Sequence, residues 1–152
     1  MSDRLFFPLF FDLTGRRILV VGAGKIAARR IRTLLPFGPA LTVVAPEPTD
    51  EVAALAAEWK LTLYRRGFEE SDLDGTEMVL SAAGDETDKV VAAACRARGI
   101  PVNAASNIEL DDFYFPGIAR QGSVVVGVTA SGTDHKAAHR VSEAIRELLK
   151  KE

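Results

Sequence analysis

Residues 17–32 read RILVVGAGKIAARRIR, and this stretch decides the fold. Its first five residues are largely apolar and stop at Gly22-Ala23-Gly24, and apolar residues at helical spacing follow at once. A short apolar run that ends at glycines and continues as a helix is typical of the first βα turn of a dinucleotide-binding unit. Gly22 permits the tight turn, Gly24 lets the backbone approach a pyrophosphate, and Ala27 lets the helix pack on the sheet. The helix start offers N–H groups and its positive dipole end to the anion, although a glycine-rich turn that only packs is the alternative.

The composition limits the class of protein. The chain has 152 residues, 47% of them hydrophobic and 26% charged, which is ordinary for one soluble globular domain. A net charge of −2 gives no global basic field, so we expect no nucleic-acid partner. The single Cys95 excludes an internal disulfide and fits a reducing, cytoplasmic location. The apolar N-terminal run is interrupted by Pro8 and Asp12, and no stretch approaches the roughly 20 apolar residues of a membrane span.

Strand-like and helical segments alternate after the opening turn. We expect strands over 17–21, 40–44, 61–64, 78–82 and 101–104, with helices between most of them. Thr49 and Thr87 are the expected caps of two of these helices, and Gly99 is the expected end of the second. This alternation predicts an α/β fold with a Rossmann-like, doubly wound parallel sheet.

Ligands of such sheets bind at the carboxyl ends of the strands. After the second strand, an acidic residue usually holds the ribose of NAD, but here the first acid is Glu47. No arginine stands there to bind a 2′-phosphate either, so NAD is favoured over NADP. The residues expected to bind the cofactor are Gly22, Ala23, Gly24, Lys25 and Ile26, Val44, and Ala83, Gly84 and Asp85 after the fourth strand.

The two ends of the chain carry different patterns. Residues 5–13 form an apolar arm or an edge strand, with phenylalanines suited to the core or to a subunit contact. Near the other end, runs over 113–118 and 123–129 predict a hairpin whose turn is 119–122, and residues 131–134 cap a last helix with one apolar stripe. A lone hairpin and helix bury too little surface by themselves. We therefore expect a homodimer, with an NAD-binding domain over 1–112 and a dimerisation region over 113–152.

Four motifs in order carry a resemblance to a known family. They are FPLFFDLTGRRILVVGAGKIAARRIRTLL (7–35), LTVVAP (41–46), NAASN (103–107) and FYFPGIARQGSVVVGVTASGT (113–133). On these motifs the chain resembles the precorrin-2 dehydrogenase family, the NAD-dependent module of sirohaem synthases. The resemblance implies a Rossmann domain followed by a dimerisation region, and oxidation of precorrin-2 to sirohydrochlorin with NAD as the hydride acceptor.

The resemblance also suggests site residues, with one departure. Relatives often carry an aspartate proposed as the acid/base where this chain has Ser106, and serine needs a neighbouring base to act. Asp111, Asp112 or His135 are candidates to substitute for it, so the catalytic candidates are Ser106, Asp111 and Asp112. The substrate carries many carboxylates, and the residues expected to bind it are Asn103, Asn107, Arg120, Lys136 and Arg140, with His139 as a further candidate.

Several alternatives stay open at this point. His135 and His139 lack a third ligand at metal spacing, so no metal site is expected. Some relatives insert ferrous iron into sirohydrochlorin, and the same protein could be such a ferrochelatase, although Ser106 argues against it. A non-catalytic NAD-sensing module is a further alternative. Many relatives continue into a helical domain that helps to hold the tetrapyrrole, whereas this sequence ends at Glu152, and the downstream pathway stays open.

Overall fold

The structure is a computed structural model that describes residues 4–152. The chain divides into two compact units, which are described separately. The first unit comprises residues 11–113, and the second comprises residues 4–10 together with residues 114–152. The N-terminal segment thus groups with the C-terminal part of the chain, although more than 100 residues separate them in the sequence.

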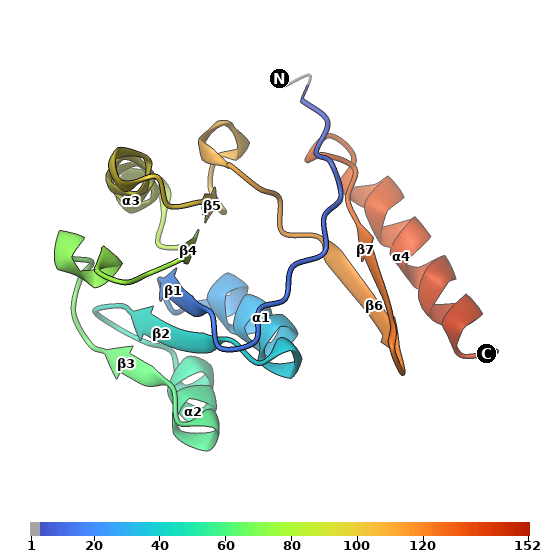
Figure 1. Cartoon of the computed structure of the whole chain (residues 1–152), viewed down its shortest axis with the longest axis horizontal. Coiled ribbons are helices and arrows are strands. Elements are labelled where there is room, and N and C mark those ends of the chain that lie inside the picture. Colours follow the sequence, from blue (N-terminus) through green and yellow to red (C-terminus); the bar gives the residue numbers. More distant parts are fainter. Residues whose placement is uncertain (1–3) are drawn as a thin grey trace. The chain divides into compact units, whose positions relative to one another are not determined.

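The first unit is built on a parallel sheet of five strands in the order β3-β2-β1-β4-β5 (Figure 1). All four neighbouring pairs are parallel, and β1 lies in the middle between β2 and β4. The strand order reverses direction between β1 and β4, as the doubly wound prediction requires. The strands are β1 (Arg17–Val21), β2 (Ala40–Val44), β3 (Thr62–Tyr64), β4 (Met78–Ser81) and β5 (Val102–Ala104).

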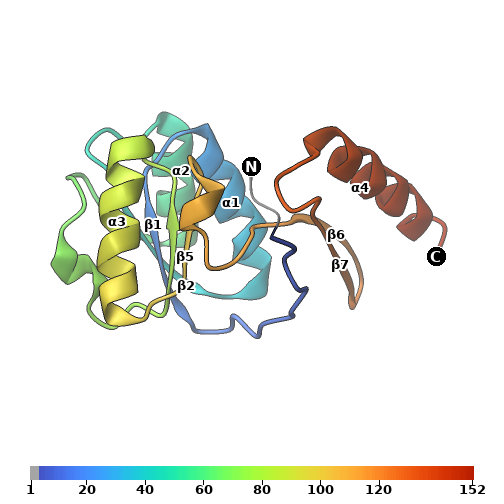
Figure 2. The ribbon, with the colours of Figure 1, turned by 90° about the horizontal axis from the view of Figure 1, so that it is seen from above.

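Helices cover both faces of this sheet. Figure 2 shows α1 and α2 on one side of the strands and α3 on the other. The connection between β3 and β4 holds only a short 3₁₀ turn in place of a full helix. The α-helices are α1 (Lys25–Leu34), α2 (Asp50–Trp59) and α3 (Asp85–Arg98), and the 3₁₀ turns are η1 (Leu35–Phe37), η2 (Glu70–Leu73) and η3 (Ile108–Leu110).

The core follows from the apolar runs that the sequence shows. Residues 18–21 of β1 are all buried because the strand is covered on both faces. Ala27 and Ile31 of α1 are fully buried on one side, and Val91 and Cys95 of α3 on the other. Each large apolar side chain buried in this way contributes about 1.5–3 kcal/mol to folding.

Most predicted helix ends are confirmed. The hydroxyl of Thr49 accepts a hydrogen bond from the Val52 N–H at 3.4 Å, and α3 ends at Gly99 in the left-handed conformation. The predicted cap at Thr87 is wrong, because α3 begins at Asp85 and Gly84 is its N-terminal flanking residue. Because Gly84 has no side chain, no side chain of the flanking residue caps the start of α3.

The second unit holds an antiparallel hairpin and a long helix. The strands are β6 (Gly117–Gln121) and β7 (Val124–Val128), and α4 spans His135–Leu149. The hairpin prediction is confirmed, but its turn lies at 122–123 rather than 119–122, because Gly122 adopts the positive φ of 58° that a tight turn needs. The Asp134 carboxylate caps α4 by accepting the Ala137 N–H at 2.8 Å, as predicted for residues 131–134.

The N-terminal segment is irregular. Residues 4–13 form no strand, so the edge-strand alternative is wrong. The ring of Phe6 lies 5.5 Å from that of Tyr114, and the Phe6 N–H donates to the Ser131 hydroxyl at 3.4 Å. By contrast, Phe7 and Phe10 are 82% and 77% exposed, so they do not enter a core of this chain. None of the helices formed by residues 4–152 is both long and apolar enough to span a membrane.

Candidate functional site

The site lies where the carboxyl ends of β1, β2 and β4 meet. Gly22 has φ +103°, and a Cβ at this position would lie 2.2 Å from the carbonyl oxygen of Ala82. The Gly22 N–H donates to the Val44 carbonyl at 2.9 Å, and the Ala82 N–H donates to the Val21 carbonyl at 2.7 Å. Only glycine fits this contact, so the tight turn predicted at Gly22 is also where two strand ends touch.

Beside it, the start of α1 is open. Gly24 is the N-terminal flanking residue, no side chain caps the helix there, and a Cβ added to Gly24 would meet no atom within 4 Å. Free space in front of helix N–H groups suits a pyrophosphate, so these residues fit a dinucleotide. Lys25 and Ile26 are exposed next to this space, whereas Ala27 is fully buried against the sheet.

The end of β2 shapes the site without offering a charged group. Val44 is 1% exposed and packs in the core, and its carbonyl accepts the Gly22 N–H. The Val44 side chain is therefore too deeply buried to make the cofactor contact predicted for this residue. Thr49 holds the opening turn in place, because its hydroxyl donates to the Ala23 carbonyl at 2.9 Å. Glu47 is exposed beyond the strand.

The turn between β4 and α3 forms the other wall. Ala83, Gly84 and Asp85 are all exposed, and a Cβ at Gly84 would also meet nothing within 4 Å. Asp85 pairs with Lys89, one helical turn later, at 3.3 Å. The three predicted cofactor residues after β4 thus lie on an accessible surface at a strand end, which is where ligands of doubly wound sheets bind.

A buried carboxylate that the sequence analysis did not single out lies directly behind this turn. Asp88 of α3 is fully buried, and its Oδ1 accepts the Ser81 hydroxyl at 2.6 Å and the Ala83 N–H at 3.0 Å. Its Oδ2 accepts both the hydroxyl and the N–H of Ser106, at 2.6 and 3.2 Å. Helical spacing in the sequence indicates that Asp88 is buried, because it lies three residues before Val91 and seven before Cys95, on the same face of α3.

The two other catalytic candidates hold the edge of the sheet. The Asp111 carboxylate accepts the Ala104 N–H at 2.6 Å, and the Asp112 carboxylate accepts the Val102 N–H at 3.0 Å. β5 is an edge strand with a neighbour on one side only, so these bonds occupy N–H groups that the sheet leaves unpaired. Both carboxylates thus bind backbone N–H groups of β5, and a catalytic role for Asp111 or Asp112 stays a prediction.

The asparagines near β5 also have structural partners. Asn103 is buried, its carbonyl accepts a hydrogen bond from Arg30, and its amide donates to the Phe113 carbonyl at 3.0 Å. Asn107 caps η3 by accepting the Glu109 N–H at 3.0 Å. Ser106, which follows β5, is exposed.

The remaining predicted substrate residues belong to the second unit. Arg120 lies in β6, opposite Val125, rather than in the turn where the sequence suggested it. Lys136 and Arg140 are exposed on α4, four residues apart. Within residues 4–152, no three His, Cys, Asp or Glu side chains gather in a way that could hold a metal ion.

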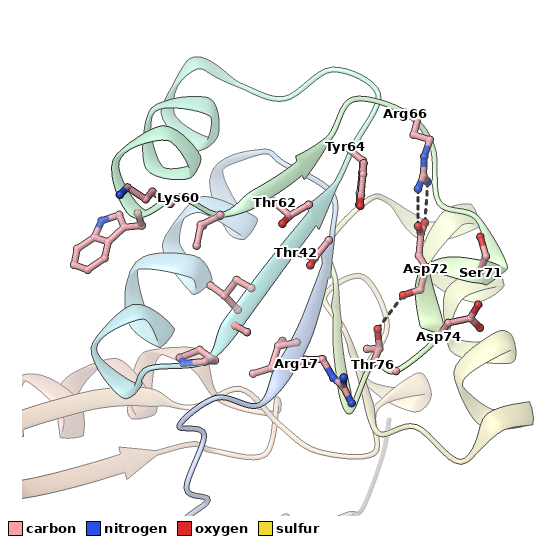
Figure 3. A pocket seen from close by; sticks show the side chains of 17 residues that line it. Arg17, Thr42, Lys60, Thr62, Tyr64, Arg66, Ser71, Asp72, Asp74 and Thr76 are labelled. Atoms are coloured by element: carbon pink, nitrogen blue, oxygen red, sulfur yellow. Dashed lines mark hydrogen bonds and ion pairs between the residues drawn. The ribbon is translucent and has the colours of Figure 1, made fainter.

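A separate groove of about 660 Å³ lies along the open face of β2 and β3. Figure 3 shows Thr42, Thr62 and Tyr64 on the strands, facing the connector that carries Asp72. Arg17 lines the groove at the amino end of β1. Because ligands of such sheets bind at the opposite, carboxyl ends of the strands, this groove is not part of the cofactor site.

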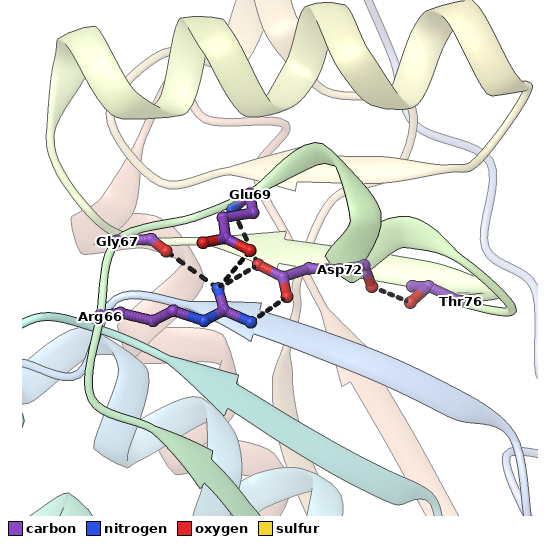
Figure 4. A network of polar contacts seen from close by, with 5 residues as sticks. All are labelled: Arg66, Gly67, Glu69, Asp72 and Thr76. Carbon is purple, nitrogen blue, oxygen red and sulfur yellow. Dashed lines mark hydrogen bonds and ion pairs between the residues drawn. The ribbon is translucent and has the colours of Figure 1, made fainter.

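An ion-pair network braces this connector (Figure 4). Arg66 donates to both oxygens of Asp72, at 2.9 and 2.7 Å, and to the Gly67 carbonyl at 3.0 Å. The hydrogen bond from Arg66 is the main cause that lowers the pKa of Asp72 below its usual range. With Glu69 at 3.8 Å from the same guanidinium, the network braces a connector that contains a 3₁₀ turn but no α-helix of its own.

Comparison with known proteins identifies the family. Residues 9–117 match the family described as "Putative NAD(P)-binding", a span that contains all five strands of the sheet. The chain belongs to this NAD(P)-binding family. The Rossmann-like fold that the sequence predicts is confirmed.

Two curated relatives have names that refer to siroheme. The chain is 40% identical over 152 residues to a probable multifunctional siroheme biosynthesis protein HemA of Ruminiclostridium josui, covering 97% of this chain and 29% of that protein. It is 42% identical over 128 residues to the siroheme synthase of Pseudomonas entomophila, covering 84% and 28%. The chain thus spans less than a third of the length of these curated relatives.

One solved structure is covered by this chain over a larger share of its length than these relatives are. The structure of SirC, a precorrin-2 dehydrogenase, superposes with a TM-score of 0.75 at 29% identity, over 93% of this chain and 70% of that one. The similarity therefore extends beyond the sheet into the hairpin and the last helix. This agrees with the family resemblance that the sequence motifs indicate.

Proposed function

We propose that this chain is a precorrin-2 dehydrogenase, which oxidises precorrin-2 to sirohydrochlorin with NAD in sirohaem biosynthesis. The observation that carries the proposal is the similarity to SirC over 93% of the chain, joined to an open helix start at Gly24. The siroheme-related names of two relatives at 40% and 42% identity support it. The fold alone would not support a specific activity, because the same kind of sheet occurs in proteins with many different activities.

The residues of the crevice account for binding and orientation. Gly22 and Gly24 let the backbone come close to the pyrophosphate, and the α1 N–H groups bind it. Ala83 and Gly84 line the opposite wall, where small side chains leave room for a flat ring. The bound nicotinamide supplies the hydride acceptor, and the protein supplies position and electrostatics. Ser106 is the exposed polar side chain at the end of β5 that meets the reacting edge of the substrate.

The cofactor is NAD rather than NADP in this proposal. A 2′-phosphate needs a basic side chain near the end of β2, and the residues there are Ala45, Pro46 and Glu47. Glu47 would repel such a phosphate. Calorimetric titration with NADH and NADPH tests this point, and tighter binding of NADPH would contradict it.

Exposed cations of the second unit are the proposed partners of the substrate carboxylates. These are Arg120, Lys136 and Arg140, all exposed at their positions in β6 and α4. Replacing Lys136 and Arg140 by glutamine should raise the KM for precorrin-2 and leave NADH binding unchanged. An unchanged KM in this double variant would remove these two side chains from the substrate site.

The chain is also proposed to form a homodimer in the cytoplasm. Val141 and Leu148 of α4 are 49% and 59% exposed, and Leu5 of the N-terminal segment is 89% exposed. Exposed apolar residues gathered on one unit are typical of an interaction surface. Light scattering should give twice the chain mass for the wild type and a lower mass for Leu148→Asp. The free thiol of Cys95 fits a reducing compartment.

The decisive experiment follows NADH absorbance. The full chain is mixed with NAD and enzymatically prepared precorrin-2, and the rate is compared with that of the same mixture without protein. Formation of NADH and sirohydrochlorin at equal rates supports the proposal. Absence of NADH above the background rate refutes it, and NADH binding without turnover would favour the sensing alternative. Metal-dependent loss of the sirohydrochlorin spectrum tests for chelatase activity in the same sample.

A further inference from the structure

Asp88 is a buried carboxylate without a basic partner. It is 0% exposed, and no ion pair joins it to a Lys, Arg or His among residues 4–152. Burying an uncompensated charge is costly unless hydrogen bonds satisfy it. Here four donors from the ends of β4 and β5 do so, namely the Ser81 hydroxyl, the Ala83 N–H, and the N–H and hydroxyl of Ser106.

These four bonds occupy both oxygens of the carboxylate. All four partners donate, and an ionised carboxylate accepts at about four positions across its two oxygens. Both carboxylate oxygens of Asp88 therefore accept hydrogen bonds. The hydroxyl of Ser106 uses its hydrogen toward Oδ2, at 2.6 Å, so its oxygen keeps lone pairs that can accept a further hydrogen bond.

Accessibility separates the two serines on Asp88. Ser81 is 0% exposed, whereas Ser106 is exposed beyond the end of β5. Asp88 itself cannot touch a ligand. Of the two serines whose hydroxyl groups bind Asp88 in the described part of the chain, Ser106 is the exposed one.

We propose that Ser106 and Asp88 form a proton relay, with Ser106 as the catalytic residue that touches the substrate and Asp88 as its positioning residue. This inference rests on the proposed function, in which the substrate loses a hydride and a proton. As the bond between the proton and a substrate atom facing Ser106 breaks, Oγ accepts that proton. The original hydroxyl proton of Ser106 moves to Oδ2 of Asp88, and the electron pair of the broken bond stays in the substrate. The exposed serine then releases its new proton to water and takes back the proton from Asp88, which restores the starting state of both groups, while the hydride passes to NAD in the proposed function.

The relay predicts a matched set of kinetic effects. Asp88→Asn and Ser106→Ala should each lower kcat for precorrin-2 oxidation by about 100-fold, with little change in KM. Because the two groups act as one unit, the double variant should be no slower than the slower single variant. Ser106→Thr keeps a hydroxyl at this position and should recover most of the rate lost in Ser106→Ala.

A remote carboxylate provides the control. Asp72→Asn also removes a nearly buried carboxylate from a hydrogen-bond network, with a side-chain exposure of 6%, but lies in the connector rather than the crevice. It should lower the melting temperature and keep the wild-type kcat. Calorimetric titration with NADH should give the wild-type dissociation constant for Ser106→Ala, because this change touches neither the Gly24 turn nor the hydrogen bond from the Ala83 N–H to Asp88.

The outcomes are distinguishable. If the wild type forms no NADH, the proposed function fails and the relay fails with it. If the wild type is active and both Asp88→Asn and Ser106→Ala keep its kcat, the relay is wrong while the dehydrogenase stands. Should Asp88→Asn fail to fold, Ser106→Ala and Ser106→Thr decide, because Ser106→Ala leaves three of the four donors to Asp88 in place and Ser106→Thr keeps all four. A rise in KM with unchanged kcat would likewise overturn the relay.

Discussion

The contact at Gly22 leads to a quantitative prediction. In Gly22→Ala, the new methyl carbon would lie 2.2 Å from the Ala82 carbonyl oxygen and 2.6 Å from its carbon. Ordinary contact begins at 3.4 Å, so the ends of β1 and β4 must separate by about an ångström, against an interior that packs like a crystal. The hydrogen bond from the Ala82 N–H to the Val21 carbonyl joins the same two strand ends and would be stretched.

The cost has two parts. Overpacking in a well-packed region costs about 1–3 kcal/mol. Holding an alanine at φ +103° costs roughly another 1–3 kcal/mol. A total near 4 kcal/mol should lower the melting temperature of a chain of this size by about 10 °C. The opening turn would move at the same time, so NADH binding should also be lost.

Gly24→Ala is the matched control, two residues away. Its methyl carbon would meet no atom within 4 Å, and its φ of −94° suits any residue, so the melting temperature should fall only slightly. The methyl group would instead occupy the space in front of α1, and NADH affinity should fall by about tenfold or more. Thermal unfolding followed by circular dichroism, with calorimetric titration of NADH, measures both quantities. If Gly22→Ala melts like the wild type and binds NADH normally, the steric argument is refuted.

Three further predictions concern stability and the edge of the sheet. Burial raises the pKa of the Cys95 thiol to about 11 from an ordinary 9.0. The neutral thiol therefore contributes its full stability below pH 9, and this contribution should be lost as the pH rises toward 11. Denaturant unfolding of the wild type should show this fall in stability, and unfolding of Cys95→Ala should not. Arg66 lowers the pKa of Asp72, so that pair stabilises the fold above the ordinary pKa of 3.8 and its contribution should disappear as the pH falls further; a steep acid dependence that persists in Asp72→Asn would contradict this. Asp112→Ala frees the Val102 N–H at the sheet edge and should cost about 0.5–1.5 kcal/mol in urea unfolding with kcat unchanged, whereas a large loss of kcat at wild-type stability would support a catalytic role for Asp112.

The predicted elements were confirmed where a local pattern has one physical solution. The apolar run that ends at Gly22 can only be a strand followed by a tight turn, and Thr49 before two acids can only cap a helix well. The errors fall where two local solutions compete. Thr87 is a good cap in isolation, but the residue that flanks the start of α3 is Gly84, three residues earlier. Arg120 reads as a turn residue, yet Gly122 takes the turn and places Arg120 in β6.

The sequence by itself determined the sheet, its crossovers and the dinucleotide turn, because apolar periodicity and glycine positions are local properties of the chain. Only the tertiary structure decided which partners the acids near the strand ends have. Asp111 and Asp112 look free in the sequence, but each pairs with an N–H of β5. Asp88 looks like an ordinary acid in the first turn of a helix, but the fold brings Ser106, which follows it by 18 residues, onto its carboxylate. These hydrogen bonds join residues that are apart in the sequence, and no local pattern encodes such contacts.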